Sequence, residues 1–232
     1  MAKKKLHNVT KAAIVQVATR RFLQTGYTGT SVKSISDELG ISTGHVTFYY
    51  PTKEHLLAIL TQMLCDFQWK MMNWQTDRGE DALTALCVEL MSMAAICEEN
   101  AIGKDFYLSA YTHPKPLEII RRNDATRAKT VFAEYCPGWT DSQFAEAETL
   151  VSGIEYATLM TTGDSQPIDV RITGALEEIL KIYGVPPEVR REKIEKSLSM
   201  DYRSTGRRIL KEFMEYIDQV NEQVIDDLPI YH

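Results

Sequence analysis

The sequence predicts an all-α protein with two parts: a small N-terminal domain of three helices over residues 1–55 and a larger helical domain over residues 56–232. Three observations predict this fold. Apolar residues recur three and four positions apart along most of the chain, which is the period of an amphipathic helix. Glycines and prolines punctuate these segments at spacings typical of helix ends. A basic N-terminus also precedes an otherwise acidic chain.

The first helix is predicted upstream of Gly26, where Ile14, Val17, Ala18 and Phe22 form one apolar stripe. Glycine adopts backbone conformations that other residues avoid, so Gly26 is a suitable end for this helix. We expect the stripe to share one small core with the next two helices.

The second helix carries Val32, Ile35 and Leu39 on one face. Gly40 ends it, because glycine tolerates the left-handed conformation common at helix C-termini. Ser42 then begins a new helix as its N-cap, with a hydroxyl that can accept from a free backbone N–H.

The third helix is predicted over residues 43–50, since Pro51 prevents its continuation. At about 100° per residue, Val46, Tyr49 and Tyr50 fall on one side. The opposite side is small, polar and aromatic and carries Gly44, His45, Thr47 and Phe48. A short helix held by a turn against a preceding helix is the helix-turn-helix arrangement, which places its second helix in the major groove of DNA.

The charge distribution favours the same function. Residues 1–55 contain eight Lys or Arg and three acids, a balance of 8 − 3 = +5, so the remainder carries −6 − 5 = −11. Basic residues neutralise phosphates and supply much of the affinity for DNA. A lysine-rich N-terminus can also serve only solubility, but together with the helical pattern it favours a DNA-binding domain.

The segment FLQTGYTGTSVKSISDELGISTGHVTFYYPTKEHLL resembles the DNA-binding domain of the tetracycline-repressor (TetR) family, and the resemblance covers roughly residues 9 to 60. The matching positions are Gly26-Tyr27, Thr30-Ser31-Val32, Ile35, Gly40-Ile41-Ser42, Gly44 and Pro51-Thr52-Lys53-Glu54. The chain departs from the family at Val46 and Thr47, where leucine and tyrosine are usual. That tyrosine commonly touches a phosphate, a contact that Phe48 or Tyr49 would have to take over in part.

The expected DNA-binding residues follow from the resemblance and from the outer side of the third helix. Phosphates would be held by Lys53 and by the hydroxyls of Thr30, Ser31 and Ser42. Base edges would be approached by Thr43, Gly44, His45, Thr47 and Phe48. Because this helix has no arginine, thymine methyl contacts and DNA shape are expected to matter more than guanine contacts. Lys3 to Lys5 would form an arm on the DNA backbone or in the minor groove.

Every segment beyond Thr52 has helical spacing. A long helix runs from Thr52 to a break at Gly79, and helices are then predicted around 83–97, 106–111, 117–132, 141–162 and 167–183. After Pro186 and Pro187, one terminal helix is predicted to carry Leu210, Phe213, Ile217, Val220 and Val224.

Two of these helices, around Phe144 to Met160 and Ile168 to Ile182, are candidates for self-association. They combine small with apolar residues, which lets helices of two subunits approach closely: Ala147, Val151, Gly153, Ile154, Ala157, Leu159, Gly174, Ala175, Leu176 and Ile179. In the TetR family the corresponding pair builds a four-helix dimer interface, which implies a homodimer. The alternative is that both helices pack only within one subunit.

The resemblance also implies a small-molecule effector enclosed by the larger domain. Aromatic and methionine side chains are typical of such cavities, and the candidates are Trp69, Met72, Trp74, Phe106, Tyr107, Tyr111, Phe132, Tyr156 and Met160. Glu155 could pair with a cationic ligand, or it could bond an arginine or reach solvent. The alternative for the apolar candidates is that they form ordinary core.

The sequence contains no HExxH, GxSxG, GxxxxGK[ST] or GxGxxG motif, so we expect no enzyme and no cofactor. Cys65, Cys87, Cys97 and Cys136 lack the close pairs of a metal site and are expected as reduced core residues. Neither a signal peptide nor a run of ~20 apolar residues is present. We therefore expect a cytoplasmic protein without a membrane partner.

These expectations predict a dimeric regulator that binds a double-stranded DNA operator with two heads, about 34–36 Å apart or somewhat more. An effector would shift the helix that begins at Thr52, change the spacing of the heads and release the DNA. Because most members of the TetR family are repressors, the resemblance favours a repressor over an activator. The alternative is an interaction module that keeps this fold but acts through a protein partner.

Overall fold

The computed structural model describes residues 10–77, 79–220 and 222–228, and within these ranges the chain forms twelve helices and no strand. The prediction of an all-α protein is confirmed, while Lys3 to Lys5 lie outside the described residues. The helices are α1 (Lys11–Thr25), α2 (Val32–Leu39), α3 (Thr43–Tyr49), α4 (Lys53–Thr76), α5 (Ala82–Glu99), α6 (Ala101–Thr112), α7 (Pro114–Val131), α8 (Asp141–Leu159), α9 (Ile168–Ile182), α10 (Pro187–Leu198), α11 (Tyr202–Asp218) and α12 (Glu222–Asp226).

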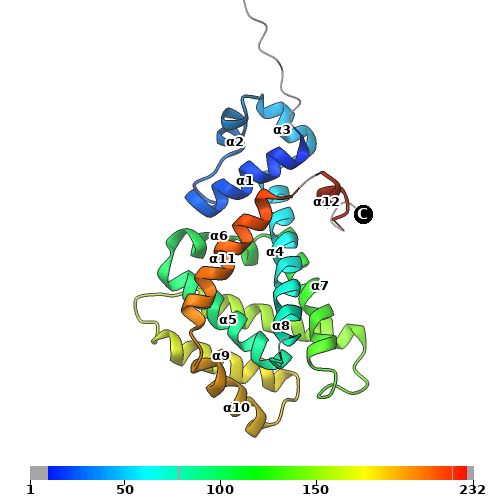
Figure 1. Cartoon of the computed structure of the whole chain (residues 1–232), viewed down its shortest axis with the longest axis vertical. Helices are drawn as coiled ribbons and strands as arrows, with labels where there is room; N and C mark the ends of the chain where they lie inside the picture. Colours follow the sequence, from blue (N-terminus) through cyan, green and yellow to red (C-terminus); the bar gives the residue numbers. More distant parts are fainter. Residues whose placement is uncertain (1–9, 78, 221, 229–232) are drawn as a thin grey trace, which may run out of the picture.

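Helices α1 to α3 form a head at one end of the molecule (Figure 1). Its boundaries follow the predicted signals. Ser31 and Ser42 cap α2 and α3 by accepting from the N–H groups of Ser34 and His45, and Gly40 ends α2 in the left-handed conformation, at φ 68°. The core beneath them includes Ile35 and Val46, both fully buried.

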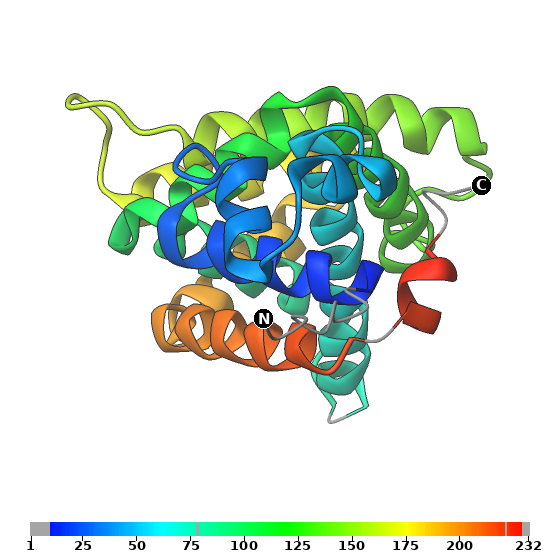
Figure 2. The same ribbon diagram turned by 90° about the horizontal axis from the view of Figure 1, so that it is seen from above.

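Helix α4 begins under the head and continues into the larger part of the protein, which we call the body (Figure 1). The boundary expected at residue 55 thus falls within a continuous helix. Seen from above, the head lies over the bundle of the body (Figure 2). In that bundle α4 packs on α7, α7 on α8 and α8 on α9, while α5 and α6 pack against several of these helices.

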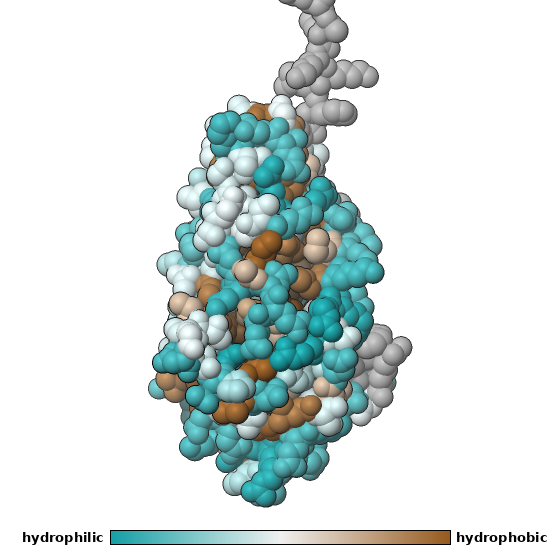
Figure 3. Space-filling view, turned by 90° about the vertical axis from the view of Figure 1, so that its left-hand side faces the viewer, coloured by the Kyte–Doolittle hydropathy of each residue, from teal (hydrophilic) through white to brown (hydrophobic). Residues whose placement is uncertain are grey.

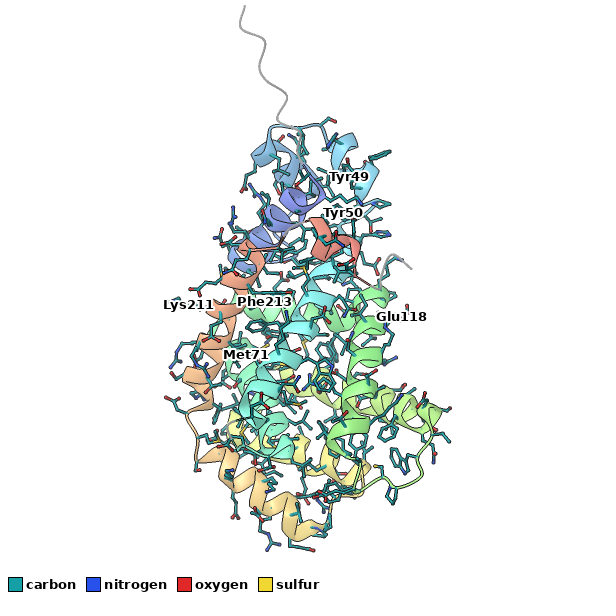
Figure 4. All side chains as sticks on the ribbon, turned by 45° about the vertical axis from the view of Figure 1, so that its right-hand side comes forward. Tyr49, Tyr50, Met71, Glu118, Lys211 and Phe213 are labelled. Carbon is teal, nitrogen blue, oxygen red and sulfur yellow. The ribbon has the colours of Figure 1, made fainter. Side chains whose placement is uncertain are left out.

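The section after Pro186 differs from the prediction of one terminal helix, because the described residues form three: α10, α11 and α12. Helix α11 ends at Asp218, so Val224 does not continue its stripe. Phe213 turns inward to Phe67 of α4, with ring centroids 5.5 Å apart, while Lys211 points outward (Figure 4). Phe213, Ile217 and Val220 are buried, so this part of the stripe packs against the chain's own body.

The C-terminal helices also reach the head. Asp226 pairs with Lys11 at 2.7 Å and Asp218 with Arg20 at 3.1 Å. Between them, Gln16 of α1 donates to the carbonyl oxygen of Val220 at 2.7 Å. The end of the chain thus holds α1 in contact with the body.

The four cysteines are buried and free, as expected. Within the described residues, no helix combines the length and the apolar character needed to cross a membrane.

A candidate DNA-binding surface and an internal cavity

Helix α3 presents one face to solvent at the outer side of the head. Most of the residues predicted to approach DNA are exposed there: Ser42, Thr43, Gly44, His45, Thr47 and Phe48. Phe48 is 80% exposed, the largest value among the exposed large hydrophobic residues, and it has no role in the core. We call Thr43, Gly44, His45, Thr47 and Phe48 the outer face of α3.

The opposite side of α3 fixes the orientation of this face. Val46 is fully buried and Tyr50 is 1% exposed. The hydroxyl of Tyr50 donates to the carbonyl oxygen of Lys11 at 3.3 Å, which ties the end of α3 to α1 (Figure 4). Tyr49 is half-buried and makes edge contacts with His45 and Phe48. The buried contacts of Val46 and Tyr50 therefore fix the orientation of the outer face of α3.

The polar groups of two residues predicted to hold phosphates are engaged inside the protein. Thr30 is 2% exposed, and its hydroxyl donates to the carbonyl oxygen of Gly26 at 2.7 Å. The Lys53 ammonium donates to the carbonyl oxygens of Tyr27 and Thr30 at 2.8 and 2.9 Å and lies 3.9 Å from the centroid of the Tyr27 ring. Both residues stabilise the loop between α1 and α2. Ser31 remains exposed while it caps α2.

The remaining cations of the described head all have carboxylate partners. Lys11 and Arg20 pair with the C-terminal helices, Arg21 pairs with Glu38 at 2.7 Å, and Lys33 pairs with Asp37 at 2.7 Å. The Lys33 side chain is 75% exposed, and such a surface pair costs little to break. Lys33 is thus an exposed cation on the head that the sequence patterns did not single out.

The surface of the head is largely polar on the side seen in Figure 3, where hydrophobic residues gather farther down, over the body. A polar surface of this kind is suited to contact with a charged polymer, whereas an apolar surface would be suited to packing against another protein.

The body encloses a cavity of about 60 Å³ among α4 to α9 and the residue after α9. Of the predicted ligand-binding residues, the structure brings four to its wall: Tyr107, Tyr111, Phe132 and Glu155. Trp69, Phe106 and Tyr156 do not reach it, because they pack elsewhere around the core. Met72 lines a separate cavity of about 20 Å³ between α4, α5, α6 and α11. The side chain of Trp74 lies outside the described part.

The wall of the larger cavity contains a charged cluster, which is buried at Arg127 and Glu148 and half-buried elsewhere. The sequence patterns missed it apart from Glu155. We call Glu89, Asp124, Arg127, Glu148 and Glu155 the cavity cluster. Arg127 is 3% exposed and makes two hydrogen bonds to the Glu89 carboxylate, at 3.0 and 2.6 Å, with Asp124 at 3.5 Å. Helical spacing could have marked Arg127 and Glu148 as inward-facing, but not which charges would meet.

Two carboxyl groups of the cavity cluster have, among the residues that the structure describes, only tyrosine hydroxyls as hydrogen-bond partners. Tyr183 donates to Glu148, and Tyr111 donates to Glu155 at 2.8 Å. Burial, together with a smaller effect of the nearby Asp124 carboxylate, raises the pKa of Glu148 to about 8. Burial likewise raises the pKa of Glu155 well above its ordinary value, and it raises that of Asp124 to about 6. The low-dielectric wall thus favours the protonated forms.

The cavity and the head are joined through α6, which carries Tyr107 and Tyr111 on one part of its surface and Asp105 on another. The Asp105 carboxylate accepts from the N–H of Thr28 at 2.9 Å and from its hydroxyl at 2.8 Å. Gly26 permits this approach, since at its φ of 83° a Cβ atom would lie 2.6 Å from Asp105 Oδ2. One helix therefore contacts both the cavity and the loop before α2.

The predicted self-association helices, α8 and α9, have exposed faces that include Gly153, Ala157 and Gly174 of the predicted residues. Val151, Leu159, Leu176 and Ile179 point into the subunit's own core, as do Ala147 and Ala175. The exposed positions, which we call the α8–α9 stripe, are Leu150, Gly153, Ala157, Met160, Val170 and Gly174. Leu150, Met160 and Val170 are among the few large hydrophobic residues exposed in the described chain.

Comparison with known proteins places the head in a family. Residues 14–60 match the family model of bacterial regulatory proteins, tetR family. No curated protein matches the chain.

Solved structures with a similar arrangement include a gamma-butyrolactone receptor described as ArpA-like, with 19% identity over 87% of this chain and 96% of that chain, at a TM-score of 0.43. CprB from Streptomyces coelicolor A3(2), a TetR family protein, has 21% identity over 87% and 98%, at 0.41. AmtR of Mycobacterium smegmatis has 18% identity over 85% and 99%, at 0.38. Similarity at this level assigns neither a ligand nor an operator.

Proposed function

We propose that this chain, whose residues 14–60 match the TetR-family DNA-binding domain, is a sequence-specific regulator of transcription that acts as a repressor. The observation that carries the proposal is the outer face of α3, which is exposed over a fully buried Val46. A short helix in this position can enter the major groove with its outward side chains at the base edges.

The contacts to DNA divide by chemistry. Thr43, His45 and Thr47 offer hydrogen-bonding groups to base edges, and Phe48 offers an apolar surface to a thymine methyl group. Phosphates would be held by three exposed residues of the head, through the hydroxyls of Ser31 and Ser42 and the ammonium of Lys33. Lys53 acts indirectly by fixing the loop between α1 and α2.

We further propose that the protein works as a homodimer through the α8–α9 stripe. Gly153 and Gly174 have open space where a Cβ atom would be, so the surface at both sites has room for a closely packed partner. Two heads on successive major grooves read about twice the sequence that one head reads. Leu150→Glu should convert the dimer to a monomer in sedimentation analysis, whereas a dimer that persists would reject this surface.

Regulation by a small molecule is the third part of the proposal. A ligand in the cavity would press on Tyr107 and Tyr111, and α6 would carry the displacement to Asp105 and Thr28. Such a ligand can act only through its different affinities for the DNA-bound and free conformations. Asp105→Asn should weaken this coupling and leave ligand binding itself nearly unchanged.

The function is tested by selecting bound duplexes from a random-sequence pool with the full-length protein in dilute buffer. We expect an enriched site with two related half-sites about one helical turn apart, and protection of both from cleavage. The affinity for this site should fall steeply with salt, as phosphate contacts release counterions. Failure to enrich any sequence, with no binding even in dilute buffer, would reject the proposal.

A further inference from the structure

The wall of the cavity in the body has more acidic groups than basic ones, and of the acidic residues Glu148 is buried while Glu89, Asp124 and Glu155 are half-buried. Four carboxyl groups of the cavity cluster face a single guanidinium, so the fully ionised cluster would carry a net charge of −3. A buried charge is costly unless it is paired. The wall therefore lacks positive charge.

Arg127 cannot supply this charge to all four carboxyl groups. Its two terminal nitrogens are engaged by Glu89 and Asp124. Glu148 and Glu155, both on α8, receive only the hydroxyl hydrogen bonds of Tyr183 and Tyr111. These two carboxyl groups are the ones left without a cationic partner among the described residues.

A separate observation points to a missing ligand group. Glu148 is 3% exposed, and its Oε2 atom has no hydrogen-bond partner in the described structure. Buried polar atoms nearly always have partners, so an orphaned carboxyl oxygen in a cavity wall indicates a place for a donor. An N–H group of a bound molecule would satisfy it.

We propose that the cavity binds a small organic cation. This cation is a primary or secondary ammonium with a compact apolar group, and its N–H groups donate hydrogen bonds to Glu148 and Glu155. This inference rests on the proposed function, because it names the chemical class of the effector. Within that scheme the ligand's charge neutralises the two carboxylates that the protein itself leaves uncompensated.

The rest of the wall suits such a molecule. Rings of Tyr107, Phe132 and Tyr183 line the cavity, and aromatic faces attract ammonium groups. The volume of about 60 Å³ is small beside the several hundred Å³ of typical drug-sized sites. A compact amine is therefore favoured. Amines with a four-carbon chain or one ring exceed this volume, so they would have to move α6 or α8 as they bind, which is the displacement that the proposed regulation requires.

An anionic ligand fits poorly for the same reasons. The described cavity wall contains one guanidinium. Its terminal nitrogens are engaged by carboxylates and only its Nε atom has no partner among the described residues, whereas a carboxylate ligand would meet four acidic groups. A neutral ligand would fill the space without compensating Glu148 or Glu155. The two alternatives thus define the controls of the experiment.

The test is isothermal titration of the full-length protein at pH 7 with benzylammonium, with ethylbenzene as a neutral probe of the same shape and benzoate as an anionic one. We expect benzylammonium to bind once per chain and at least about tenfold more tightly than either control, the equivalent of about 1.4 kcal/mol. n-Butylammonium and cyclohexylammonium extend the panel to other compact apolar groups.

Carboxyl-to-amide variants locate the site. Glu148→Gln and Glu155→Gln should each weaken benzylammonium binding at least about tenfold, because they remove charge and keep the shape. Glu118→Gln is the matched control, since Glu118 is exposed on the outside of α7 (Figure 4) and does not line the cavity. Thermal unfolding of each variant establishes that it folds.

A second measurement detects the protons that are released when the cation binds. The groups that face the site are Cys65 of α4, Glu89 of α5, Tyr107 and Tyr111 of α6, Asp124 and Arg127 of α7, Glu148 and Glu155 of α8, and Tyr183 after α9. A cation that displaces a proton from Glu148 must release it to the buffer. The measured heat should therefore differ between buffers of different ionisation enthalpy, and Glu148→Gln should remove most of that difference.

Equal affinity for benzylammonium and ethylbenzene, equal weakening by Glu118→Gln and Glu148→Gln, or no binding by any amine of the panel would overturn the inference. DNA binding is measured on the same preparation without any amine. A protein that binds its operator but no amine loses this inference and keeps its DNA-binding function. A protein that binds amines but no DNA keeps the cation-binding cavity and loses the proposed DNA-binding function.

Discussion

The head and the body each contain an arginine–glutamate pair of nearly the same length, and the two pairs differ in their surroundings. In the head, Arg21 lies 2.7 Å from Glu38, with side chains 28% and 36% exposed. In the body, Arg127 lies 2.6 Å from Glu89, with side chains 4% and 20% exposed. Burial therefore distinguishes the two pairs, whereas distance does not.

The difference teaches how the two parts are used. In the head, charged and polar groups face water and are available to a polyanion. In the body, the cavity cluster faces a small cavity, and two of its carboxyl groups, Glu148 and Glu155, have no cationic partner among the described residues. The first arrangement suits a surface that binds DNA, and the second suits a site that is sensitive to a small charged molecule.

The comparison is tested most strongly by removing each arginine. Arg127→Met should lower the free energy of unfolding by about 3–5 kcal/mol, because it leaves several buried carboxyl groups without their cation. Arg21→Met should lower it by less than about 1 kcal/mol, since its pair is open to water. Denaturant unfolding measures both, and equal losses would show that burial does not separate the pairs.

A second test uses one residue type in both places. Phe48 is 80% exposed, while Phe132 is 2% exposed and stacks on Tyr183 with ring centroids 3.9 Å apart. Phe132→Ala should cost about 3–5 kcal/mol of stability, and Phe48→Ala should change stability by less than about 0.5 kcal/mol. In DNA binding, Phe48→Ala should weaken affinity by about 1–2 kcal/mol. A destabilised Phe48→Ala variant would contradict a purely external role.

A third test follows pH. Folded Glu148 keeps its proton up to a pKa of about 8, whereas in the unfolded chain it releases the proton near the ordinary glutamate pKa of about 4.3. Between these values the folded state binds more protons, so this group's contribution to stability falls as pH rises from about 4.3 to about 8 and is constant above. The slope is at most about 1.4 kcal/mol per pH unit.

Unfolding measured across this range should show a smaller decline for Glu148→Gln than for the unsubstituted protein. Glu118→Gln, on the surface, should leave the decline unchanged. If Glu148→Gln had the same pH dependence as the unsubstituted protein, the carboxyl group would not retain its proton in the folded state.

The smallest expected effect concerns the C-terminal helices. Replacing Asp218 and Asp226 together by Asn removes the carboxylates that pair with Arg20 and Lys11 of α1. DNA affinity should rise by a factor of up to about three at low salt, and the gain should shrink as salt increases. Glu212→Gln combined with Glu215→Gln removes the same charge from the middle of α11 and should have less effect.

The sequence predicts the head well because its fold depends on local signals. Gly40, Ser42 and Pro51 each act within one turn of helix, and the sides of α3 follow from its period alone. The same local reasoning could not predict that Thr30 would be buried or that Lys53 would bond two carbonyl oxygens. Those contacts depend on how the loop before α2 folds back.

The cavity shows the limit more clearly. Helical spacing indicates which residues face inward, but Arg127 meets Glu89 across 38 positions of the chain, and Tyr183 meets Glu148 across 35. Such pairings depend on how α5, α7, α8 and α9 pack, and no local pattern contains that information. The division of the C-terminal section into α10, α11 and α12 was missed for a related reason, since Leu210 to Val224 kept helical spacing across the break after Asp218.

The central claim is that the outer face of α3 binds DNA, and one titration tests it most directly. The affinity for the selected duplex is measured by fluorescence anisotropy for Thr47→Glu and for Thr130→Glu, which adds the same charge at an exposed position on α7, outside the head. Thr47→Glu should bind at least about 100-fold more weakly than the unsubstituted protein, about 2.7 kcal/mol, and Thr130→Glu should bind normally. Equal affinities for the two variants would contradict the claim.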